Sequence, residues 1–329
     1  MSTNTTIFSD NLSDAWVGRI DGPNPKHALW YTTIQPMSDP GGVPPGAALI
    51  GFACDEGVRR NYGRPGSADG PDGIRAALGW TAVHDEYPRY DAGDVGVTGD
   101  DMEGAQKELA DAVATVRKAG HLPIVLGGTH EAAFGSHCGL RSSMSKGAMP
   151  PTIINLDQHL DIRNSERPTH GTPFRQIFEQ VGKDFDYAVF GVSPADNTTF
   201  NFEEAERMGV RVVLDDELAE CSSAEAAAKA LQAAWGRETI HLSIDLDVLS
   251  NAVAPGVSSP AAVGVPLANI RAICKTLAHT GKLGLVDVVE LNPGLDVDKR
   301  TARVAGRLIH EIAAGHMAAT AGGQKTVRT

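Results

Sequence analysis

The sequence predicts an α/β fold in which a parallel sheet is covered by helices on both faces. Short apolar runs alternate along the chain with stretches whose apolar residues recur at helical spacing, as in successive βα units. The 36 glycines and 19 prolines are scattered between these elements as turn residues. No flexible linker, charge block or repeat divides the chain, so residues 1–329 are expected to form one domain, with 1–13 and 317–329 as loose tails.

Six short apolar runs have the length and composition of buried strands. They cover residues 47–53, 122–126, 152–156, 187–192, 239–244 and 285–291. Because parallel sheets are buried on both faces, runs of this kind are expected to form the central strands.

Three helices have recognisable ends. Asp101 is expected to cap a helix that stops at Gly120. Ser222 and Glu225 form the capping-box pattern that opens an alanine-rich helix. A last helix is expected over residues 301–314, where apolar residues recur at helical spacing.

Composition excludes several classes of function. Asp and Glu outnumber Lys and Arg by 41 to 29, whereas a dedicated nucleic-acid binder carries clustered positive charge. No apolar run approaches the roughly 20 residues of a membrane span, and the first residues lack the features of a signal peptide. The four cysteines lie far apart, so reduced thiols in a cytoplasmic protein are expected. We therefore expect neither nucleic acid nor a membrane as partner.

Four of the predicted strands are followed by ionisable side chains. In a parallel α/β sheet the ligand site lies outside the carboxyl ends of the strands, where these side chains would meet. Residues at positions i, i+2 and i+4 of an extended segment also point to the same side. The strand-end residues are His130 after LPIVLGGT, Asp157, His159 and Asp161 in DQHLD, Asp245 and Asp247 in DLD, and Glu290 in ELNP.

Such a cluster predicts bound cations. Four neighbouring carboxylates oppose one another's ionisation unless positive charge neutralises them, and two divalent cations would balance their charge. Mixed oxygen and nitrogen ligands suit Mn, Co, Ni or Zn better than Ca or Mg. A single Asp-x-His after a strand is ordinarily a solvated turn, but three ligand-bearing strand ends together indicate a binuclear transition-metal site.

This arrangement predicts hydrolysis of a carbon–nitrogen bond. Two metal ions about 3.5–4 Å apart make a shared water acidic enough to attack a planar carbon near neutral pH. Bond cleavage then needs a proton on the departing nitrogen, and His170, on the loop after DQHLD, is a candidate donor. Glu290, one strand over, is a candidate partner for an amidinium or guanidinium nitrogen of the substrate.

The ordered set of motifs resembles the ureohydrolase family of arginases, agmatinases and formimidoylglutamases over nearly the whole chain. The resemblance implies a three-layer α/β/α sandwich, a homotrimer or homohexamer, and two metal ions, Mn first with Ni as the alternative. It implies that His130 and Asp161 serve one metal and His159 and Asp247 the other, with Asp157 and Asp245 shared. It also implies that Glu290 contacts the nitrogens of the substrate.

Other stretches look most like formimidoylglutamase of histidine degradation, which splits N-formimidoyl-L-glutamate into L-glutamate and formamide. These stretches are residues 16–21, 51–61, 70–72 and 253–266. The two carboxylates of that substrate need basic or polar partners at the mouth of the pocket. The candidates are Arg163, Arg60, Asn61 and Ser259, together with Arg59.

Three positions depart from the formimidoylglutamase pattern. Thr129 stands where the family usually has Asp or Gly, Gln158 replaces the usual Ala, and His170 replaces a small residue. A His-Gly pair here looks more like arginases and agmatinases. Two alternatives therefore stay open: hydrolysis of a guanidino compound (agmatine-like, a small guanidine or a biguanide) with release of urea, or a catalytically silent subunit in a hetero-oligomer with an active paralogue.

Overall fold

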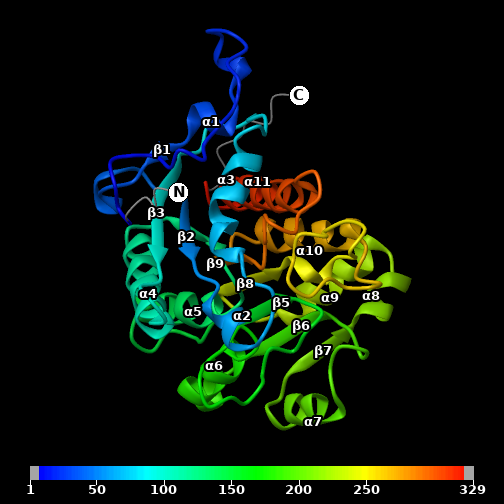
Figure 1. Cartoon of the computed structure of the whole chain (residues 1–329). Helices are drawn as coiled ribbons and strands as arrows, with labels where there is room; N and C mark the ends of the chain where they lie inside the picture. Colours follow the sequence, from blue (N-terminus) through cyan, green and yellow to red (C-terminus); the bar gives the residue numbers. More distant parts are fainter. Residues whose placement is uncertain (1–6, 322–329) are drawn as a thin grey trace.

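The computed structural model describes residues 7–321, and a nine-stranded sheet with helices on both faces forms its centre (Figure 1). The strand order is β1-β3-β2-β4-β9-β8-β5-β6-β7, and every neighbouring pair is parallel. The strands are β1 (Gln35–Pro36), β2 (Ala47–Ala53), β3 (Arg89–Gly96), β4 (Leu122–Gly127), β5 (Thr152–Leu156), β6 (Tyr187–Val192), β7 (Arg211–Leu214), β8 (Ile240–Asp245) and β9 (Leu283–Val289).

Helices pack on the sheet as two separate layers. One layer contains α3, α9, α10 and α11, and the other contains α4, α5 and α6. The helices are α1 (Trp30–Thr33), α2 (Glu56–Arg60), α3 (Gly70–Leu78), α4 (Met102–Lys118), α5 (Ala132–Ser143), α6 (Pro173–Val181), α7 (Thr199–Arg207), α8 (Asp215–Glu220), α9 (Ser223–Ala233), α10 (Leu267–His279) and α11 (Arg300–Thr320).

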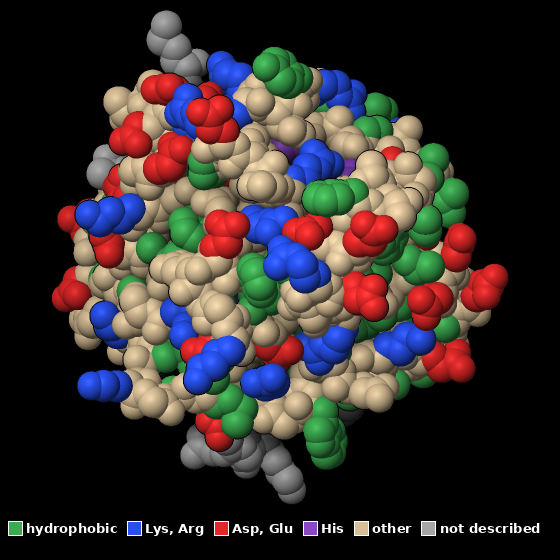
Figure 2. Space-filling model, turned by 90° about the horizontal axis from the view of Figure 1, so that it is seen from below, with side chains coloured by type: hydrophobic (Ala, Val, Ile, Leu, Met, Phe, Trp, Pro, Cys, Tyr) green, Lys and Arg blue, Asp and Glu red, His purple; other side chains and the backbone are tan. Residues whose placement is uncertain are grey.

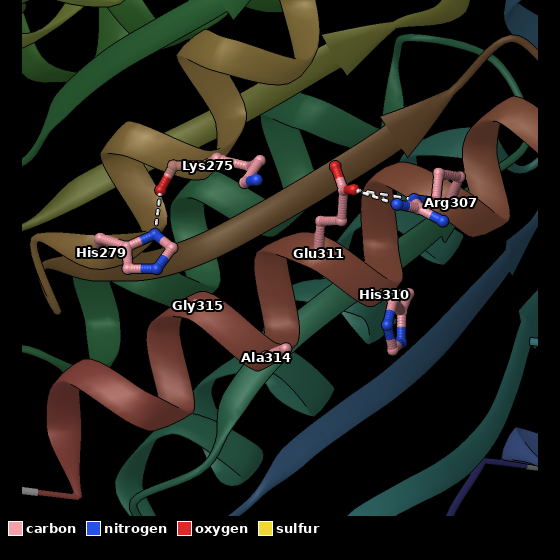
Figure 3. Close-up of a pocket in the computed structure, with 7 residues that line it drawn as sticks. All are labelled: Lys275, His279, Arg307, His310, Glu311, Ala314 and Gly315. Carbon is pink, nitrogen blue, oxygen red and sulfur yellow. Dashed lines mark hydrogen bonds and ion pairs between the residues drawn. The ribbon is translucent and has the colours of Figure 1, made fainter. Parts of the chain in front are cut away.

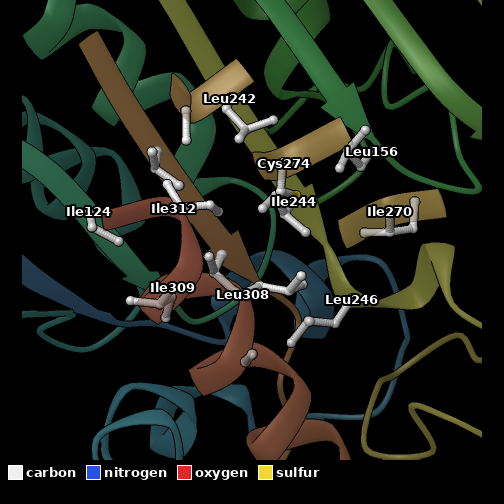
Figure 4. Packing of buried hydrophobic residues seen from close by; sticks show 14 of the residues in the cluster. Ile124, Leu156, Leu242, Ile244, Leu246, Ile270, Cys274, Leu308, Ile309 and Ile312 are labelled. Carbon is white, nitrogen blue, oxygen red and sulfur yellow. The ribbon is translucent and has the colours of Figure 1, made fainter. Parts of the chain in front are cut away.

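Successive residues of one strand belong to different hydrophobic clusters, as the alternation of strand side chains requires. Leu49 packs on the side of α3 and α11, whereas its neighbour Ile50 packs on the side of α4. In the first cluster, Leu242 and Ile244 of β8 lie among side chains of α10 and α11 such as Ile309 (Figure 4). The predicted three-layer α/β/α sandwich is therefore confirmed.

The predicted elements are present with small differences in their bounds. All six predicted strands occur, and β2, β5 and β6 have the predicted bounds. The Asp101 carboxylate accepts a hydrogen bond from Gly104 N at the start of α4, and Ser222 and Glu225 form the capping box of α9. Helix α11 runs to Thr320, beyond the predicted end at 314, so residues 317–320 of the predicted tail are helical. Residues 322–329 of that tail and residues 1–6 of the other lie outside the described residues.

The sheet order explains where the predicted site lies. Strands β4, β9, β8 and β5 are consecutive neighbours, so their carboxyl ends lie next to one another at one edge. Each of these four strands leads into one of the ionisable motifs. Among the described residues, no helix is long and apolar enough to cross a membrane.

Candidate active site

The structure brings the six predicted metal ligands together in two overlapping groups of buried or nearly buried side chains. The first group consists of His130, Asp157, Asp161 and Asp245, and the second of Asp157, His159 and Asp247. In the first group, His130 Nδ1 lies 3.1 Å from carboxylate oxygens of both Asp157 and Asp161. It also lies 3.2 Å from Oδ2 of Asp245. One imidazole nitrogen therefore faces three carboxylates.

The second group lies beside the first and shares Asp157 with it. His159 Nδ1 lies 3.2 Å from Asp247 Oδ2 and 3.6 Å from Asp157 Oδ1. Asp245, which the resemblance also assigns to both metals, belongs to the first group only. Its Oδ1 atom instead accepts a hydrogen bond of 2.8 Å from the backbone N–H of Asp247.

Two of the site residues have a backbone conformation that is unusual for side chains with a Cβ. Asp161 and Glu290 have φ angles of 49° and 71°, in the left-handed region. Such conformations cost free energy, and they concentrate at functional sites where the surrounding structure enforces them. Here they turn the chain after β5 and β9, and the carboxylates of both residues lie at the cluster.

Two polar side chains of the strands, Ser243 and Asn155, contact the ligands His130 and Asp157 and orient them. His130 Nε2 lies 3.0 Å from the hydroxyl of Ser243, and Asn155 Nδ2 donates to Asp157 Oδ2 at 3.0 Å. Ser243 and Asn155 precede Asp245 and Asp157 by two residues on their strands, so they share a face with them. Sequence reasoning missed both, although a polar residue in an otherwise apolar strand was the available signal.

The electrostatics of the cluster fit bound divalent cations. Burial, followed by the Asp247 and Asp157 carboxylates, raises the pKa of Asp245 well above its ordinary value. Burial opposes the charged form of His130, but the three facing carboxylates raise its pKa well above 6.5. His130 Nδ1 is buried and has no hydrogen-bond partner among the described residues. Metal ions would neutralise the carboxylates and use this nitrogen, so the donor set fits them.

His170 and Glu290, the two predicted catalytic residues, contact each other beside the cluster. Glu290 Oε1 accepts a hydrogen bond of 2.9 Å from the backbone N–H of His130, and it lies 3.1 Å from His170 Nδ1. Burial opposes the charged form of His170, but the Glu290 carboxylate raises its pKa above the ordinary value. His170 is therefore disposed to hold a proton at the edge of the cluster.

The site is nearly closed to solvent. The side chain of His130 is fully buried, whereas those of His159 and His170 keep 12% and 15% exposure. On the face of the molecule shown in Figure 2, histidine is visible in a small hollow beside a Lys or Arg side chain. Access to the cluster is therefore narrow.

Of the predicted substrate-binding residues, Asn61 contacts His170, and Arg163 lies over Gly171, the next residue in the chain. Asn61 Nδ2 is 3.0 Å from His170 Nε2. The guanidinium group of Arg163 lies over Gly171, since a Cβ built there would be 3.2 Å from Arg163 Nη1. Arg163 is half-buried and forms no ion pair with any described acidic residue. A cation without an acidic partner therefore lies over the residue that follows the candidate proton donor.

The structure contradicts the expectation for Arg60. Its side chain is 7% exposed, and its guanidinium donates to Glu56 at 3.1 Å and to both oxygens of Glu103 at 2.8 and 2.9 Å. It also donates to the carbonyls of Asp100 and Pro168. All its donors are used, so Arg60 ties loops together and has no N–H left for a substrate. Arg59 is 60% exposed and pairs with Asp55 and Glu56.

The two unusual residues beside the ligands contact neighbouring loops. Thr129 Oγ1 donates to the buried carboxylate of Glu131, which also accepts from Cys54 Sγ at 2.9 Å and Gly57 N at 3.1 Å. Gln158 Nε2 donates to the carbonyl of Ser259. Glu131 thus anchors the start of α2 next to His130. This role was not predicted from the sequence.

A second hollow lies on the surface between α10 and α11, with a volume of about 270 Å³ (Figure 3). Its one acidic lining residue, Glu311, is paired with Arg307 at 2.7 Å and with Arg271 at 2.5 Å. No group of potential metal ligands found in the described residues lies there. The strand-end cluster is therefore the candidate active site.

Comparison with known proteins agrees with this geometry. The arginase family model matches residues 45–315. The chain belongs to the arginase family. Among its family relatives, formimidoylglutamase from Corynebacterium efficiens is 58% identical over 95% of this chain and 98% of that protein. Formimidoylglutamase from Nocardia farcinica is 46% identical over 93% of this chain and 98% of that protein.

A solved structure from the same family also matches the fold. The crystal structure of Trypanosoma cruzi formiminoglutamase with Mn²⁺ superposes with a TM-score of 0.75 at 28% identity. The match covers 82% of this chain and 93% of the Trypanosoma cruzi chain. The arginase-family fold is therefore shared by most of both chains.

Proposed function

We propose that this arginase-family chain is a binuclear metal-dependent hydrolase that converts N-formimidoyl-L-glutamate and water into L-glutamate and formamide. The observation that carries the proposal is the guanidinium of Arg163, which has no acidic partner among the described residues and lies over Gly171, the residue after His170. A half-buried cation without an acidic partner suits a substrate carboxylate, whereas it would repel the ammonium group of an agmatine-like amine. The names of the curated relatives support the same substrate.

We further propose that the six clustered side chains hold two divalent transition-metal ions, with Mn²⁺ as the first candidate. His130, Asp161 and Asp245 would serve one ion and His159 and Asp247 the other, with Asp157 between them. When bound, such a pair of ions would polarise the substrate and would supply a water that is deprotonated near neutral pH. The Mn²⁺ in the Trypanosoma cruzi protein supports this metal, and the same ligand types also accept Ni²⁺.

The protein's own residues account for the other requirements of the reaction. Glu290, held by His130 N and Ser258 Oγ, presents a carboxylate to an amidine nitrogen. His170 can pass a proton to the nitrogen of glutamate as the carbon–nitrogen bond breaks. Arg163 would bind a substrate carboxylate, which places the amidine carbon at the cluster.

The second candidate is hydrolysis of a guanidino compound to urea and an amine. The pair of residues His170 and Gly171 favours it, because the resemblance links His-Gly at this position to enzymes that act on guanidines. The unpaired Arg163 restricts this alternative to guanidino acids. It therefore differs from the main proposal only in the group on the amidine carbon.

Product analysis of the metal-loaded protein tests the proposal. The protein is incubated separately with N-formimidoyl-L-glutamate, agmatine and a panel of guanidino acids, and formamide and urea are measured. We expect formamide as the main product, with little urea from any guanidine. Urea as the dominant product would replace the main proposal with the second candidate. No turnover until a second subunit is added would instead favour a silent partner subunit.

A further inference from the structure

Residues 256–259 have no regular secondary structure, yet partners from other parts of the chain hold each of their carbonyl groups. The four carbonyls accept from Asn292 N at 2.7 Å (Gly256), Arg64 Nη2 at 2.8 Å (Val257), Arg64 Nε at 2.9 Å (Ser258) and Gln158 Nε2 (Ser259). We call residues 256–259 the wall segment. Its backbone is fixed by side chains and loops rather than by a helix or a strand.

The wall segment crosses the candidate active site. Ser258 Oγ donates to Glu290 Oε2 at 3.3 Å, after β9, and the carbonyl of Ser259 contacts Gln158, after β5. Strand β8 lies between β9 and β5 in the sheet, and it ends at the ligand Asp245. The wall segment therefore spans the carboxyl end of β8 and borders the metal cluster.

Gln158 is built to hold one end of the wall segment. It is 2% exposed and lies between the ligands Asp157 and His159 in the chain. Its own carbonyl accepts from Ser193 N at 3.0 Å and Asn197 Nδ2 at 2.9 Å, so its backbone is fixed as well. Its amide nitrogen must face Ser259, because exchanging the amide atoms would set two acceptors against each other.

Arg64 holds the middle of the wall segment from the opposite loop. Its guanidinium donates to two successive carbonyls, and no described acidic residue forms an ion pair with it. The loop that carries Arg64 is fixed in turn, because Asn292 Nδ2 donates to the carbonyls of Arg64 and Pro65 at 3.2 and 3.0 Å. Asn292 follows Glu290 by two residues, so this clamp is tied to the site itself.

We propose that Gln158 and Arg64 determine substrate specificity by clamping the wall segment against the metal cluster. This inference rests on the proposed function. Because each carbonyl of the wall segment is hydrogen-bonded, the segment does not move to make room for a larger group. It leaves room for the hydrogen atom on the amidine carbon of a formimidoyl group and excludes the amino group that a guanidine carries there. Gln158 and Arg64 act through the wall segment and are therefore positioning residues.

The test compares two substrates that differ only at that carbon. These are N-formimidoyl-L-glutamate and N-carbamimidoyl-L-glutamate, in which an amino group replaces the hydrogen. Gln158→Met keeps the length of the side chain and removes its donor, and Arg64→Met removes both donors from an exposed side chain. The measured quantity is kcat/KM for the formimidoyl substrate divided by kcat/KM for the carbamimidoyl substrate. We expect this ratio to fall at least about tenfold in both variants, with the metal content unchanged. Equal losses for both substrates would overturn the proposal.

Hydrogen exchange gives a readout that does not depend on the substrate. Amide exchange in a peptide covering residues 253–262 should be about tenfold faster in Gln158→Met than in the original protein. The control is Asn269→Ala, which removes a buried amide that donates to the carbonyls of Leu218 and Cys221 away from the site. We expect this control to change neither the exchange nor the ratio. Unchanged exchange in Gln158→Met would overturn the clamp. A preference of the original protein for the carbamimidoyl substrate would instead contradict the proposed function.

Discussion

The Nδ1 atom of His170 lies 3.1 Å from Oε1 of Glu290, so the candidate proton donor contacts the candidate amidine-binding carboxylate. Neither residue belongs to the two ligand groups. Removing His170 should therefore affect proton transfer rather than metal binding. The contact also links two segments that are 120 positions apart in the chain.

His170→Ala should lower kcat at least about 100-fold, the usual contribution of a positioned general acid. Elemental analysis should still find two metal ions per chain, because the ligand cluster is untouched. His279→Ala, at an exposed position on α10, serves as the control and should leave kcat unchanged. A parallel loss of metal and activity would show that His170 is a ligand.

Arg163→Ala should raise KM for N-formimidoyl-L-glutamate about 10- to 100-fold, because a charged hydrogen bond to a buried carboxylate contributes about 1.5–3 kcal/mol. Its effect on kcat should be smaller. Arg60→Ala is the matched comparison, since the guanidinium of Arg60 is paired with Glu56 and Glu103. It should lower the free energy of unfolding with little change in KM. A large rise in KM in Arg60→Ala, with little change in KM in Arg163→Ala, would show that Arg60 binds the substrate carboxylate instead.

Ser243→Ala should weaken metal binding about 10- to 100-fold, the usual effect of removing the partner that orients a ligating histidine. The reason is that His130 Nε2 loses its contact with the hydroxyl at 3.0 Å. Asp245→Ala should go further and remove metal and activity together. Titration with Mn²⁺, followed by activity and by metal analysis, measures both. Full metal occupancy in inactive Asp245→Ala would disprove its assignment as a ligand.

Metal should stabilise the protein more at pH 8 than at pH 6. Burial opposes the charged imidazoles of His130 and His159, but facing carboxylates raise the pKa of both well above 6.5. Without metal, this contribution to stability is complete below pH 6.5 and is lost as the pH rises through the folded-state pKa values. Metal must displace these protons, so its affinity should rise about tenfold per pH unit for each proton released. Thermal unfolding with Mn²⁺ and with a chelator at each pH measures the difference, and an equal gain in Tm at both pH values would contradict the argument.

The ligand cluster could be predicted from the rule that parallel strands end at one edge of the sheet, because four of the strands lead into ionisable motifs. The expectation that residues 157–161 form an extended segment is wrong. The chain bends at residues 158 and 159, and Asp161 has a φ of 49°, so the turn after β5 brings these side chains together. The use of Arg60 could not be predicted in the same way. Its partner Glu103 lies 43 positions away, and only the folded loops bring the two together. The contact of Gln158 with Ser259 spans 101 positions and was hidden for the same reason.

Strand β3 was missed because its sequence, RYDAGDVG, does not look buried. The structure buries it by pairing its charges internally. The guanidinium of Arg75, from α3, donates to both oxygens of Asp91 at 2.9 Å and lies 2.7 Å from Asp94. Trp16 Nε1 adds a hydrogen bond of 2.6 Å to Asp91. Polar residues can therefore form an inner strand when every charge has a partner, which a hydrophobic pattern does not reveal.

Arg75→Ala should lower the free energy of unfolding by about 3–5 kcal/mol, because it leaves the Asp91 and Asp94 carboxylates buried without their cation. Burial already raises the pKa of Asp94 despite the nearby Arg75, so the loss of that cation should favour protonation. The variant should consequently recover part of its stability as the pH falls. Urea unfolding at two pH values measures this, with Arg303→Ala as the control because its pair with Asp298 is exposed. A loss below about 1 kcal/mol would mean that the buried charges contribute little to the position of β3.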